Sequence, residues 1–343
     1  MIPFSFAAQV EPPLVCGRVI EHDVMLYTVS TECGEVRTRV SGSFAHHAQV
    51  QTDFPVVGDY VALRLSDDSA TIEELLPRTN LFARRGAYGS HEQQPIAANL
   101  DTLFITIALN RDFNVRRLER YAVAAAASEV ASAILLTKLD LVDAPHSFIE
   151  IARSLFDLPI LAICSFDKRG FESLAPFMGP EKTVAFVGSS GAGKSTLINA
   201  LLGDTIQSVQ DVRIHDDRGK HTTTRRSILR LPDGTSLIDT PGMREFALSD
   251  ADEGISKVFQ DVATVAAECR FADCTHEVEP GCAVREQVGA DRLNSWRKLK
   301  REAAFETRKT DRFAAEAERN RWKTIHKANR ERIRARYKDF GDG

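Results

Sequence analysis

Residues 182–203 read KTVAFVGSSGAGKSTLINALLG, and this stretch decides the fold. The apolar run 184–187 predicts a buried strand of a parallel sheet, and the residues after Lys194 predict an amphipathic helix. Between them, the segment from Gly188 to Ser195 matches G-x-x-x-x-G-K-[ST] in the context that this motif requires. A glycine-rich turn that caps an ordinary helix is the alternative, but the complete motif favours a nucleoside-triphosphate site.

The residues of this loop suit a triphosphate with its magnesium ion. Glycines allow successive backbone N–H groups to surround a phosphate, and the N-terminus of the next helix adds partial positive charge. We expect Lys194 to contact the β- and γ-phosphates during catalysis and the Ser195 hydroxyl to bind Mg²⁺. The residues predicted to bind nucleotide here are Gly188, Ser189, Ser190, Gly191, Ala192, Gly193, Lys194, Ser195 and Thr196.

A second nucleotide motif, Asp239-Thr-Pro-Gly242, follows a short predicted strand. The carboxylate of Asp239 fits the Mg²⁺ shell, and the N–H of Gly242 fits a γ-phosphate. Alone, D-x-x-G is common, and a simple turn explains it better than a switch segment does. Its position after a phosphate-binding loop favours a switch segment that senses the γ-phosphate.

A base-reading motif precedes the phosphate loop. Thr137-Lys138-Leu139-Asp140 follows a predicted strand and resembles the N/T-K-x-D motif of GTPases. The Asp140 carboxylate can accept hydrogen bonds from N1–H and N2–H₂ of guanine, two donors that adenine does not present together, and the Lys138 stem can lie along the base. A helix-starting aspartate is the alternative. Thr137 stands where asparagine is commoner, which leaves the base-reading carboxylate unaffected.

The motif order is that of a circularly permuted GTPase, because the base motif comes first and the D-x-x-G switch last. Permutation is physically reasonable, since the termini of a domain often lie close together. The segment after Gly242 then continues directly into the C-terminal region, so an order–disorder change there can pull on that region. Cys164 and Ser165 form a weaker candidate loop around the base.

The surrounding pattern predicts a doubly wound, mostly parallel α/β sheet. The predicted elements, with strands and helices alternating, are 103–109, 116–127, 133–136, 145–156 and 159–163. Residues 227–231 and 236–238 predict a hairpin. The segment 77–99 shows little periodicity and is therefore predicted as a linker or long loop. The segment 211–224 is too polar for a core and is predicted as a mobile loop.

The N-terminal region predicts a small β-barrel of the OB or SH3 kind. Its β-branched runs, separated by turn residues, are 15–19, 24–29, 35–40 and 60–65. Barrels of this kind often bind nucleic acid, and Phe44, His46 and His47 are candidates for RNA contact. Loop or core positions explain these three residues more simply.

The chain has 343 residues and a net charge of −4, which suits a soluble protein of two or three domains. The charge is uneven, because the segment 285–338 holds 18 Lys or Arg against 8 Asp or Glu. This basic segment, helical from about Asp291 to Tyr337, favours a polyanionic partner; a solvated charged helix is the alternative. Neither a long apolar span nor a signal-peptide pattern occurs, so we expect a cytoplasmic monomer without membrane contact.

Three of the six cysteines cluster with a histidine as C-x₄-C-x-H-x₅-C. Three thiolates and one imidazole form a closed tetrahedral set for a structural Zn²⁺ ion. The spacing departs from the common C-x₂-C pattern, so reduced thiols are the alternative. The predicted ligands are Cys269, Cys274, His276 and Cys282, and the remaining cysteines, Cys16, Cys33 and Cys164, are expected to be packed, reduced thiols.

The combination of features resembles the RsgA family of ribosome-small-subunit-dependent GTPases over essentially the whole chain. It comprises the OB-like N-terminus, the permuted motifs, the segments GKHTTT (219–224) and DTPGMREF (239–246), and the Cys/His cluster. We divide the chain into an OB-like β-barrel (1–80), a permuted GTPase domain (81–248) and a zinc-binding, basic helical domain (249–343). The resemblance implies a late maturation factor of the small ribosomal subunit that binds the subunit and its rRNA. It also implies one structural Zn²⁺, Mg²⁺ with GTP or GDP, and slow GTP hydrolysis that the subunit stimulates.

Catalysis by this chain needs another group to orient the attacking water, because Met243 stands where Ras-like enzymes hold a water-orienting glutamine. His221 is the candidate catalytic residue, and an ordinary solvent-exposed histidine is the alternative. Thr222 or Thr223 should bind Mg²⁺ in the GTP state. Two rival functions are an ATP-dependent P-loop kinase, which T-K-L-D disfavours, and a GTP-gated RNA-binding scaffold with little catalysis of its own.

Overall fold

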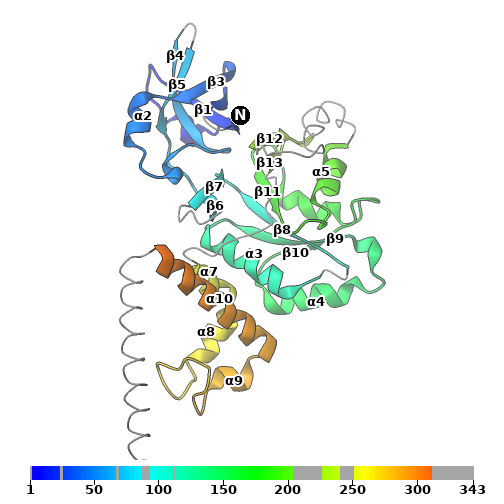
Figure 1. Ribbon diagram of the computed structural model, residues 1–343. Coiled ribbons are helices and arrows are strands. Elements are labelled where there is room, and N and C mark those ends of the chain that lie inside the picture. The colour runs from blue at the N-terminus through cyan, green and yellow to red at the C-terminus, as the bar shows by residue number, and fades with distance from the viewer. Residues whose placement is uncertain are drawn as a thin grey trace, which may run out of the picture.

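The structure, a computed structural model, describes residues 2–23, 26–66, 69–85, 93–110, 113–203, 226–239 and 251–310. Figure 1 shows three parts: a β-barrel at one end, a central α/β domain, and a group of helices at the other end. Within the described ranges, every helix is too short or too polar to span a membrane. The predicted mobile loop 211–224 lies outside the described residues.

The N-terminal part is a closed, five-stranded, OB-like barrel. Its strands run in the order β1-β2-β3-β5-β4, and β4 pairs back with β1 to close the sheet. Small and β-branched side chains such as Val19, Val29 and Ile72 fill the interior. The strands are β1 (Val15–Asp23), β2 (Leu26–Thr31), β3 (Gly34–Val40), β4 (Tyr60–Ser66) and β5 (Ser69–Leu75). The prediction of a small barrel is confirmed, and β5 is the one strand of the barrel that lies outside the predicted runs.

Short helices complete the barrel: α1 (Phe4–Ala7), α2 (Gly42–His47) and the 3₁₀ turn η1 (Gln51–Asp53). Helix α2 begins where the Ser41 hydroxyl accepts a hydrogen bond from the Phe44 N–H at 3.1 Å. Phe44 packs against the barrel core, whereas His46 and His47 are exposed. Of the three candidate RNA contacts, Phe44 therefore has the simpler packing role.

The prediction that 77–99 is a linker or long loop is wrong, because it contains a hairpin. Strands β6 (Leu81–Arg85) and β7 (Gln93–Ala98) pair antiparallel between the barrel and the central domain. Asparagine side chains fix the hairpin: the Asn80 side chain binds both N–H and C=O of Leu100, and Asn99 Nδ2 donates to Gly58 O at 3.1 Å. These side-chain contacts leave no periodic signal in the sequence.

The central sheet has the strand order β10-β9-β8-β11-β13-β12. The first five strands in this order are parallel, and β12 pairs antiparallel with β13 as the predicted hairpin. The strands are β8 (Thr102–Ala108), β9 (Ser132–Thr137), β10 (Ile160–Ala162), β11 (Thr183–Val187), β12 (Arg226–Arg230) and β13 (Ser236–Asp239). The predicted doubly wound, mostly parallel sheet is confirmed.

Alternate residues of the buried strands face two different cores, which is why helices cover both sheet faces. On β8, Leu103 and Ile105 pack with α3 (Val115–Ala127) and α4 (Pro145–Leu155). Phe104 faces the opposite core, which α5 (Lys194–Leu202) and the 3₁₀ helix η3 (Phe171–Phe177) cover. Runs that are apolar at every position predict such two-sided burial.

The barrel is joined to the central sheet through strand β12. Strand β1 pairs antiparallel with β12, in the register Glu21 opposite Ser227. The buried Arg18 of β1 donates hydrogen bonds to Thr183 Oγ1 at 2.6 Å and to Ser236 Oγ at 3.3 Å, at the first residues of β11 and β13. Strand β1 therefore extends from the start of β11 and β13 to the end of β13, because Ser227, which faces Glu21, also pairs with Asp239.

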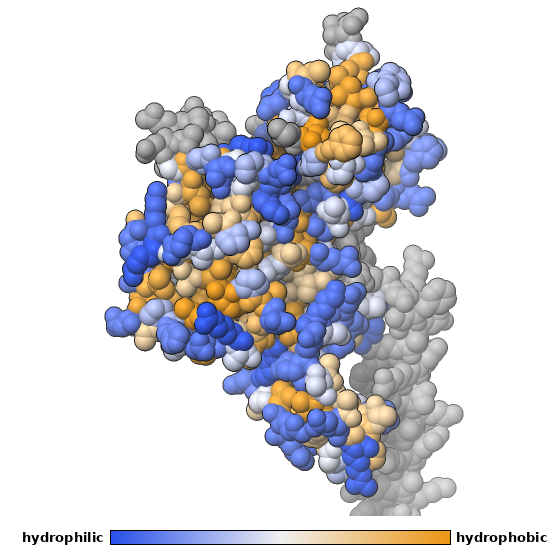
Figure 2. Space-filling view, turned by 180° about the vertical axis from the view of Figure 1, so that it is seen from behind, coloured by the Kyte–Doolittle hydropathy of each residue, from blue (hydrophilic) through white to orange (hydrophobic). Residues whose placement is uncertain are grey.

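Four helices form the C-terminal module, which we define as residues 251–310. They are α7 (Asp252–Val258), α8 (Gln260–Ala266), α9 (Ala283–Gln287) and α10 (Ala290–Thr310). Ile255, Phe259, Val284, Leu293 and Leu299 form its buried core. The predicted C-terminal helix is confirmed from Ala290 to Thr310, and its remaining length lies outside the described residues. The molecule narrows where this module joins the central domain (Figure 2).

Candidate nucleotide site and metal cluster

The predicted nucleotide-binding segments lie at one edge of the central sheet, because the parallel strands that carry them end there. Strand β9 ends at Thr137, β10 at Ala162, β11 at Val187 and β13 at Asp239. The chain reverses its direction across the sheet between β8 and β11, and ligands of doubly wound sheets bind at such switch points. The phosphate loop follows β11 and therefore lies at this point.

The phosphate loop has the backbone conformation for which its glycines are needed. Gly188, Gly191 and Gly193 have φ values of 152°, 81° and 85°. A Cβ atom on Gly188 would lie 2.1 Å from the carbonyl oxygen of Thr106, so no other residue fits there. Gly193 is the N-cap of α5, whose N-terminus thus faces the loop. The loop can present its N–H groups to a phosphate.

The Lys194 side chain folds back onto the phosphate loop in this structure. Its Nζ donates hydrogen bonds to the carbonyl oxygens of Gly188 at 2.7 Å and Ser189 at 2.9 Å. Ser190, Ser195 and Thr196 are exposed at the sheet edge, whereas Ala192 is buried. An ammonium held by two carbonyl oxygens is already close to the space that the loop encloses, so it can exchange these contacts for phosphate oxygens.

Thr137 joins the strand that precedes the predicted base-reading motif to the predicted phosphate loop. Its buried hydroxyl donates a hydrogen bond of 2.6 Å to the carbonyl oxygen of Ala192 and lies 3.3 Å from that of Ile107. Thr137 therefore holds the backbone of the phosphate loop from the protein interior and does not face solvent. The sequence showed that threonine replaces the commoner asparagine, but it did not reveal this contact.

The residues after Thr137 leave the sheet in a tight turn. Lys138 has φ 59° and ψ 45°, a left-handed conformation that is rare for residues other than glycine and occurs at functional sites. It leads into the 3₁₀ turn η2 (Leu139–Leu141), in which Asp140 is exposed. The N–H of Leu139 donates to the carbonyl of Ile163 at 3.3 Å, which ties the turn to the end of β10.

Cys164 contacts the carboxylate of Asp140, which is predicted to read the base. Its buried thiol donates to Asp140 Oδ1 at 3.4 Å, and the following Ser165 is half-buried at the same edge. The loop after β10 is fixed by the Cys164 N–H, which donates to Arg169 O at 3.0 Å. The structure therefore brings the Cys164–Ser165 loop and the Asp140 turn together.

Several predicted residues are not part of this description. His221, Thr222, Thr223, Gly242 and Met243 lie outside the described residues. Asp239 is described as the last residue of β13, which places its backbone at the nucleotide edge. The roles of Asp239 and of these five residues stay predictions.

The four predicted metal ligands form one cluster in the C-terminal module. Their ligand atoms all lie within 4.8 Å of one another. His276 Nδ1 is 3.6 Å from Cys269 Sγ and 3.5 Å from Cys282 Sγ, and these two sulfurs are 4.0 Å apart. Tetrahedral Zn²⁺ bonds of about 2.3 Å to sulfur and about 2.0–2.1 Å to nitrogen separate sulfurs by about 3.8 Å and sulfur from nitrogen by about 3.6 Å. The cluster therefore has the dimensions of a tetrahedral metal site.

The surroundings of His276 were not foreseen from the sequence. The ring centre of Trp296 lies 5.6 Å from that of His276, and the Arg297 guanidinium donates a hydrogen bond to the His276 carbonyl. Both residues come from α10, so the cluster is tied to that helix. Contacts of this kind orient metal ligands. Outside the cluster, Cys16 and Cys164 are buried as predicted, but Cys33 is exposed, so the prediction that it is packed is wrong.

Comparisons with known proteins agree with this geometry. A family model described as RsgA GTPase matches residues 75–249. The small ribosomal subunit biogenesis GTPase RsgA of Opitutus terrae is 42% identical over 323 residues, which cover 89% of this chain and 88% of that protein.

Two solved structures share the fold. YjeQ from Thermotoga maritima has a TM-score of 0.62 at 24% identity and covers 84% of this chain and 98% of its own. YloQ, described as a circularly permuted GTPase, has a TM-score of 0.59 at 22% identity and covers 88% and 96%. The fold is thus that of a circularly permuted GTPase, and the family match together with the identity to the Opitutus protein shows that this chain belongs to the RsgA GTPase family.

Proposed function

We propose that this chain hydrolyses GTP while bound to the small ribosomal subunit, during late maturation or checking of that subunit. The observation that carries the proposal is the joining of two motifs at one sheet edge: the Asp140 turn and the phosphate loop meet through the hydrogen bond from Thr137 to Ala192. One motif suits guanine and the other a triphosphate, so together they suit GTP. The relative from Opitutus terrae carries the name of a small ribosomal subunit biogenesis GTPase, which supports this partner.

The nucleotide contacts follow from the chemistry of each group. Asp140 accepts hydrogen bonds from the guanine edge, the stem of Lys138 lies along the base, and the Cys164–Ser165 loop borders it. The backbone of 188–193 surrounds the phosphates, and Lys194 leaves its two carbonyl partners to contact the β- and γ-phosphates. Ser195 and Asp239 hold Mg²⁺, and the N–H of Gly242 meets the γ-phosphate.

Hydrolysis needs a group that positions water, because Met243 cannot do so. We assign this role to His221, with Thr222 or Thr223 completing the Mg²⁺ shell. The subunit orders this machinery, so turnover is slow in its absence. A GTP-gated scaffold without catalysis is disfavoured, since the family model itself is described as a GTPase.

The Cys₃His cluster is proposed to hold one structural Zn²⁺ ion. Three thiolates and an imidazole at tetrahedral separations match the donor set that zinc prefers, and all four positions are filled by protein groups. With no open position left for a reacting water, the ion's contribution is to fix the loop 269–282 to α9 and α10.

The remaining assignments follow from the family relationship and the charge distribution. We propose a cytoplasmic monomer with three domains at 1–80, 81–248 and 249–343, which contacts rRNA through the basic segment 285–338. Binding to the subunit should then weaken steeply with salt, as it does when Lys and Arg neutralise phosphates.

The experiment that tests the function is GTP turnover measured with small subunits, large subunits or free RNA added. Of these three additions, only small subunits should stimulate GTP turnover. The rate should rise by a factor of the order of 10³ if the missing catalytic group is supplied as in other GTPases. Equal rates in all mixtures would contradict the proposal. A His221→Ala variant that binds GTP normally but keeps full stimulation would remove His221 from the mechanism.

Guanine recognition has its own test in Asp140→Asn. Xanthine carries an oxygen where guanine carries the N2 amino group, and an asparagine amide can donate to that oxygen. The variant should lose GTP affinity by at least about a hundredfold and gain affinity for xanthosine triphosphate. Unchanged preference for GTP would show that Asp140 does not read the base.

A further inference from the structure

Phe166 is an exposed aromatic residue at the nucleotide edge. It is 80% exposed, whereas Phe104 and Phe186 of the neighbouring strands are buried, and it belongs to neither core of the central sheet. It comes directly after Cys164 and Ser165, in the turn that follows β10. A single exposed apolar side chain has no meaning by itself. The position of this one, beside the predicted base site, is what makes it informative.

The turn that carries Phe166 has a fixed shape in the absence of nucleotide. The Cys164 N–H donates a hydrogen bond to the Arg169 carbonyl oxygen at 3.0 Å, which closes the turn on itself. The Asp167 carboxylate lies across it, because its two oxygens accept hydrogen bonds from the Arg169 N–H at 3.1 Å and from Arg169 Nε at 2.7 Å. A ligand that contacts Phe166 therefore meets a turn that is already ordered, which lowers the entropy cost of binding.

Phe166 lies close to the carboxylate that is predicted to read guanine. Cys164 Sγ is 3.4 Å from Asp140 Oδ1, and the N–H of Leu139 donates to the carbonyl oxygen of Ile163 at 3.3 Å. The two turns are therefore in direct contact. Two residues of chain span at most about 7 Å, so the Cα of Phe166 lies within that distance of the Cα of Cys164. A base whose edge is bound by Asp140 is within reach of the Phe166 ring.

The backbone of the same turn offers donors next to this carboxylate. Among the residues that the structure describes, neither the N–H of Ser165 nor that of Phe166 has a hydrogen-bond acceptor. Guanine carries the acceptor O6 beside its donors N1–H and N2–H₂. The oxygens of Asp140 and these N–H groups together complement that edge of the base. An edge bound to this turn leaves the flat faces of the base for side chains to cover.

Two side chains from neighbouring strands are placed for such contacts. Lys138 follows β9, and its Cε lies 3.9 Å from the position that a Cβ atom on Gly193 would take, so its stem extends from the base turn to the phosphate loop. Phe166 follows β10, which pairs with β9 (Figure 1). Aromatic rings stack on the flat faces of nucleic-acid bases. Phe166 is the residue of its turn with a ring of this kind.

We propose that Phe166 binds the guanine base by stacking, while Asp140 and the turn after β10 hold the edge of the base. Because this role needs a guanine at Asp140, it rests on the proposed function. Stacking does not depend on the hydrogen bonds of a base, so Phe166 contributes affinity and leaves the choice of guanine to Asp140. The contact does not involve the phosphates, so GDP and GTP gain equally from it.

Titration calorimetry of the full-length, zinc-loaded chain with GDP and with a non-hydrolysable GTP analogue tests this role. Phe166→Ala should weaken the binding of both nucleotides by the same factor, at least about fivefold, because base–aromatic stacking is lost. Phe166→Trp, which offers a larger ring, should bind at least as tightly as the parent chain. Phe166→Leu keeps an apolar side chain without a ring and should recover only part of the affinity. Phe4→Ala is the matched control, since Phe4 is 86% exposed on α1 of the barrel, and it should bind as the parent does.

The Phe166→Trp variant also reports the contact directly. Stacking on guanine quenches indole emission, so GDP should lower the emission of this variant by more than it lowers that of the parent, which has only Trp296 and Trp322. Adenosine diphosphate at the same concentration should leave the emission unchanged. Equal quenching by GDP in the variant and in the parent would mean that the base does not meet the side chain at position 166.

The remaining outcomes separate stacking from other roles of this residue. Nucleotide affinities of Phe166→Ala that equal those of the parent would overturn the proposal, and a loss of stimulation by small subunits in that variant would then place Phe166 in the subunit interface. Parent-like affinities in Phe166→Leu would exclude stacking as the cause. Without nucleotide, Phe166→Ala should keep the Tm of the parent, because the side chain is exposed. A lower Tm would mean that the ring packs within the protein.

Failure of this role and failure of the proposed function give different results. A parent chain that binds neither guanine nucleotide contradicts the proposed function, and the role of Phe166 with it. A parent chain that binds both nucleotides, while Phe166→Ala binds them equally well, contradicts the role of Phe166 alone. In that case the guanine site at Asp140 stands.

Discussion

The Thr137 hydroxyl donates a hydrogen bond of 2.6 Å to the carbonyl oxygen of Ala192, across the end of β8, which lies between their strands. One residue therefore links the turn that carries Asp140 to the loop that carries Lys194. Because both groups are buried, water cannot replace the contact. The distance between the predicted base site and the predicted phosphate site is thus fixed before any nucleotide binds.

Thr137→Val should weaken binding of GDP and GTP alike. Valine matches the shape of threonine but leaves the Ala192 carbonyl without its donor, at a cost of about 1–3 kcal/mol. Titration calorimetry should therefore show affinities lower by about 5- to 150-fold. Thr137→Ser keeps the hydroxyl and is the matched control, so comparable losses in both variants would contradict this account.

The glycines of the phosphate loop should respond differently to the same substitution. Gly188→Ala places a Cβ atom 2.1 Å from the Thr106 carbonyl, so the loop must move and nucleotide binding should be lost. Gly191→Ala meets nothing within 4 Å and costs only the positive φ, about 1–2 kcal/mol. Binding assays and thermal unfolding of the two variants check this order. A Gly188→Ala protein that binds GDP as well as Gly191→Ala would refute it.

The sheet and its nucleotide edge could be predicted because their signals are local. Residues 184–187 are apolar at every position, and the glycines and Lys194 that follow have a fixed spacing. The hairpin 81–98 could not be predicted, because the side chains of Asn80 and Asn99 stabilise it through partners distant in sequence. The contact between Thr137 and Ala192 was invisible for the same reason.

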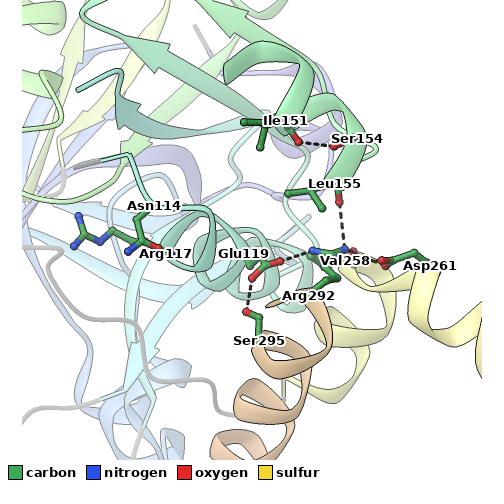
Figure 3. A network of polar contacts seen from close by, with 10 residues as sticks. All are labelled: Asn114, Arg117, Glu119, Ile151, Ser154, Leu155, Val258, Asp261, Arg292 and Ser295. Atoms are coloured by element: carbon green, nitrogen blue, oxygen red, sulfur yellow. Dashed lines mark hydrogen bonds and ion pairs between the residues drawn. The ribbon is translucent and has the colours of Figure 1, made fainter. Parts of the chain in front are cut away.

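Charge patterns were the least informative part of the sequence. The basic segment 285–338 favours a polyanionic partner, yet its Arg292 is buried between Glu119 and Asp261 (Figure 3). The sequence does not distinguish a buried arginine from an exposed one, because only the residues that surround it in the fold make the difference. These two partners of Arg292 lie 173 and 31 positions away in the sequence.

The barrel should lose stability at alkaline pH. Burial, with a smaller effect of Glu32, raises the pKa of Cys16 to about 11, and burial, with a smaller effect of Asp59, raises the pKa of Tyr27 to about 12. Both groups stay protonated in the folded chain, whereas the unfolded chain loses these protons from about pH 9 to 10 upward. Their stabilising contribution is therefore complete below about pH 9 and declines as pH rises towards the folded-state values.

Thermal unfolding at pH 8 and pH 10.5 tests whether the stability of the protein falls as the pH rises. The fall in Tm between the two pH values should be smaller in a Cys16→Ala/Tyr27→Phe double variant than in the parent chain. Cys33→Ala, which removes an exposed thiol, should leave the fall unchanged. A double variant that loses as much Tm as the parent would mean that other groups cause the alkaline sensitivity.

Removal of the metal should be visible at Trp296. Its ring centre is 5.6 Å from that of His276, and His276 joins two of the sulfur ligands, so loss of the ion should let the imidazole and the indole move apart. The chain has two tryptophans, so a Trp322→Phe background makes Trp296 the only reporter. Chelation should then change the emission spectrum of Trp296 and release about one equivalent of zinc. It should also make Cys269, Cys274 and Cys282 accessible to alkylation, while the buried Cys16 and Cys164 stay protected. Purified protein that contains well under one equivalent of zinc, or chelation that leaves all three cluster thiols protected, would refute the assignment of the site.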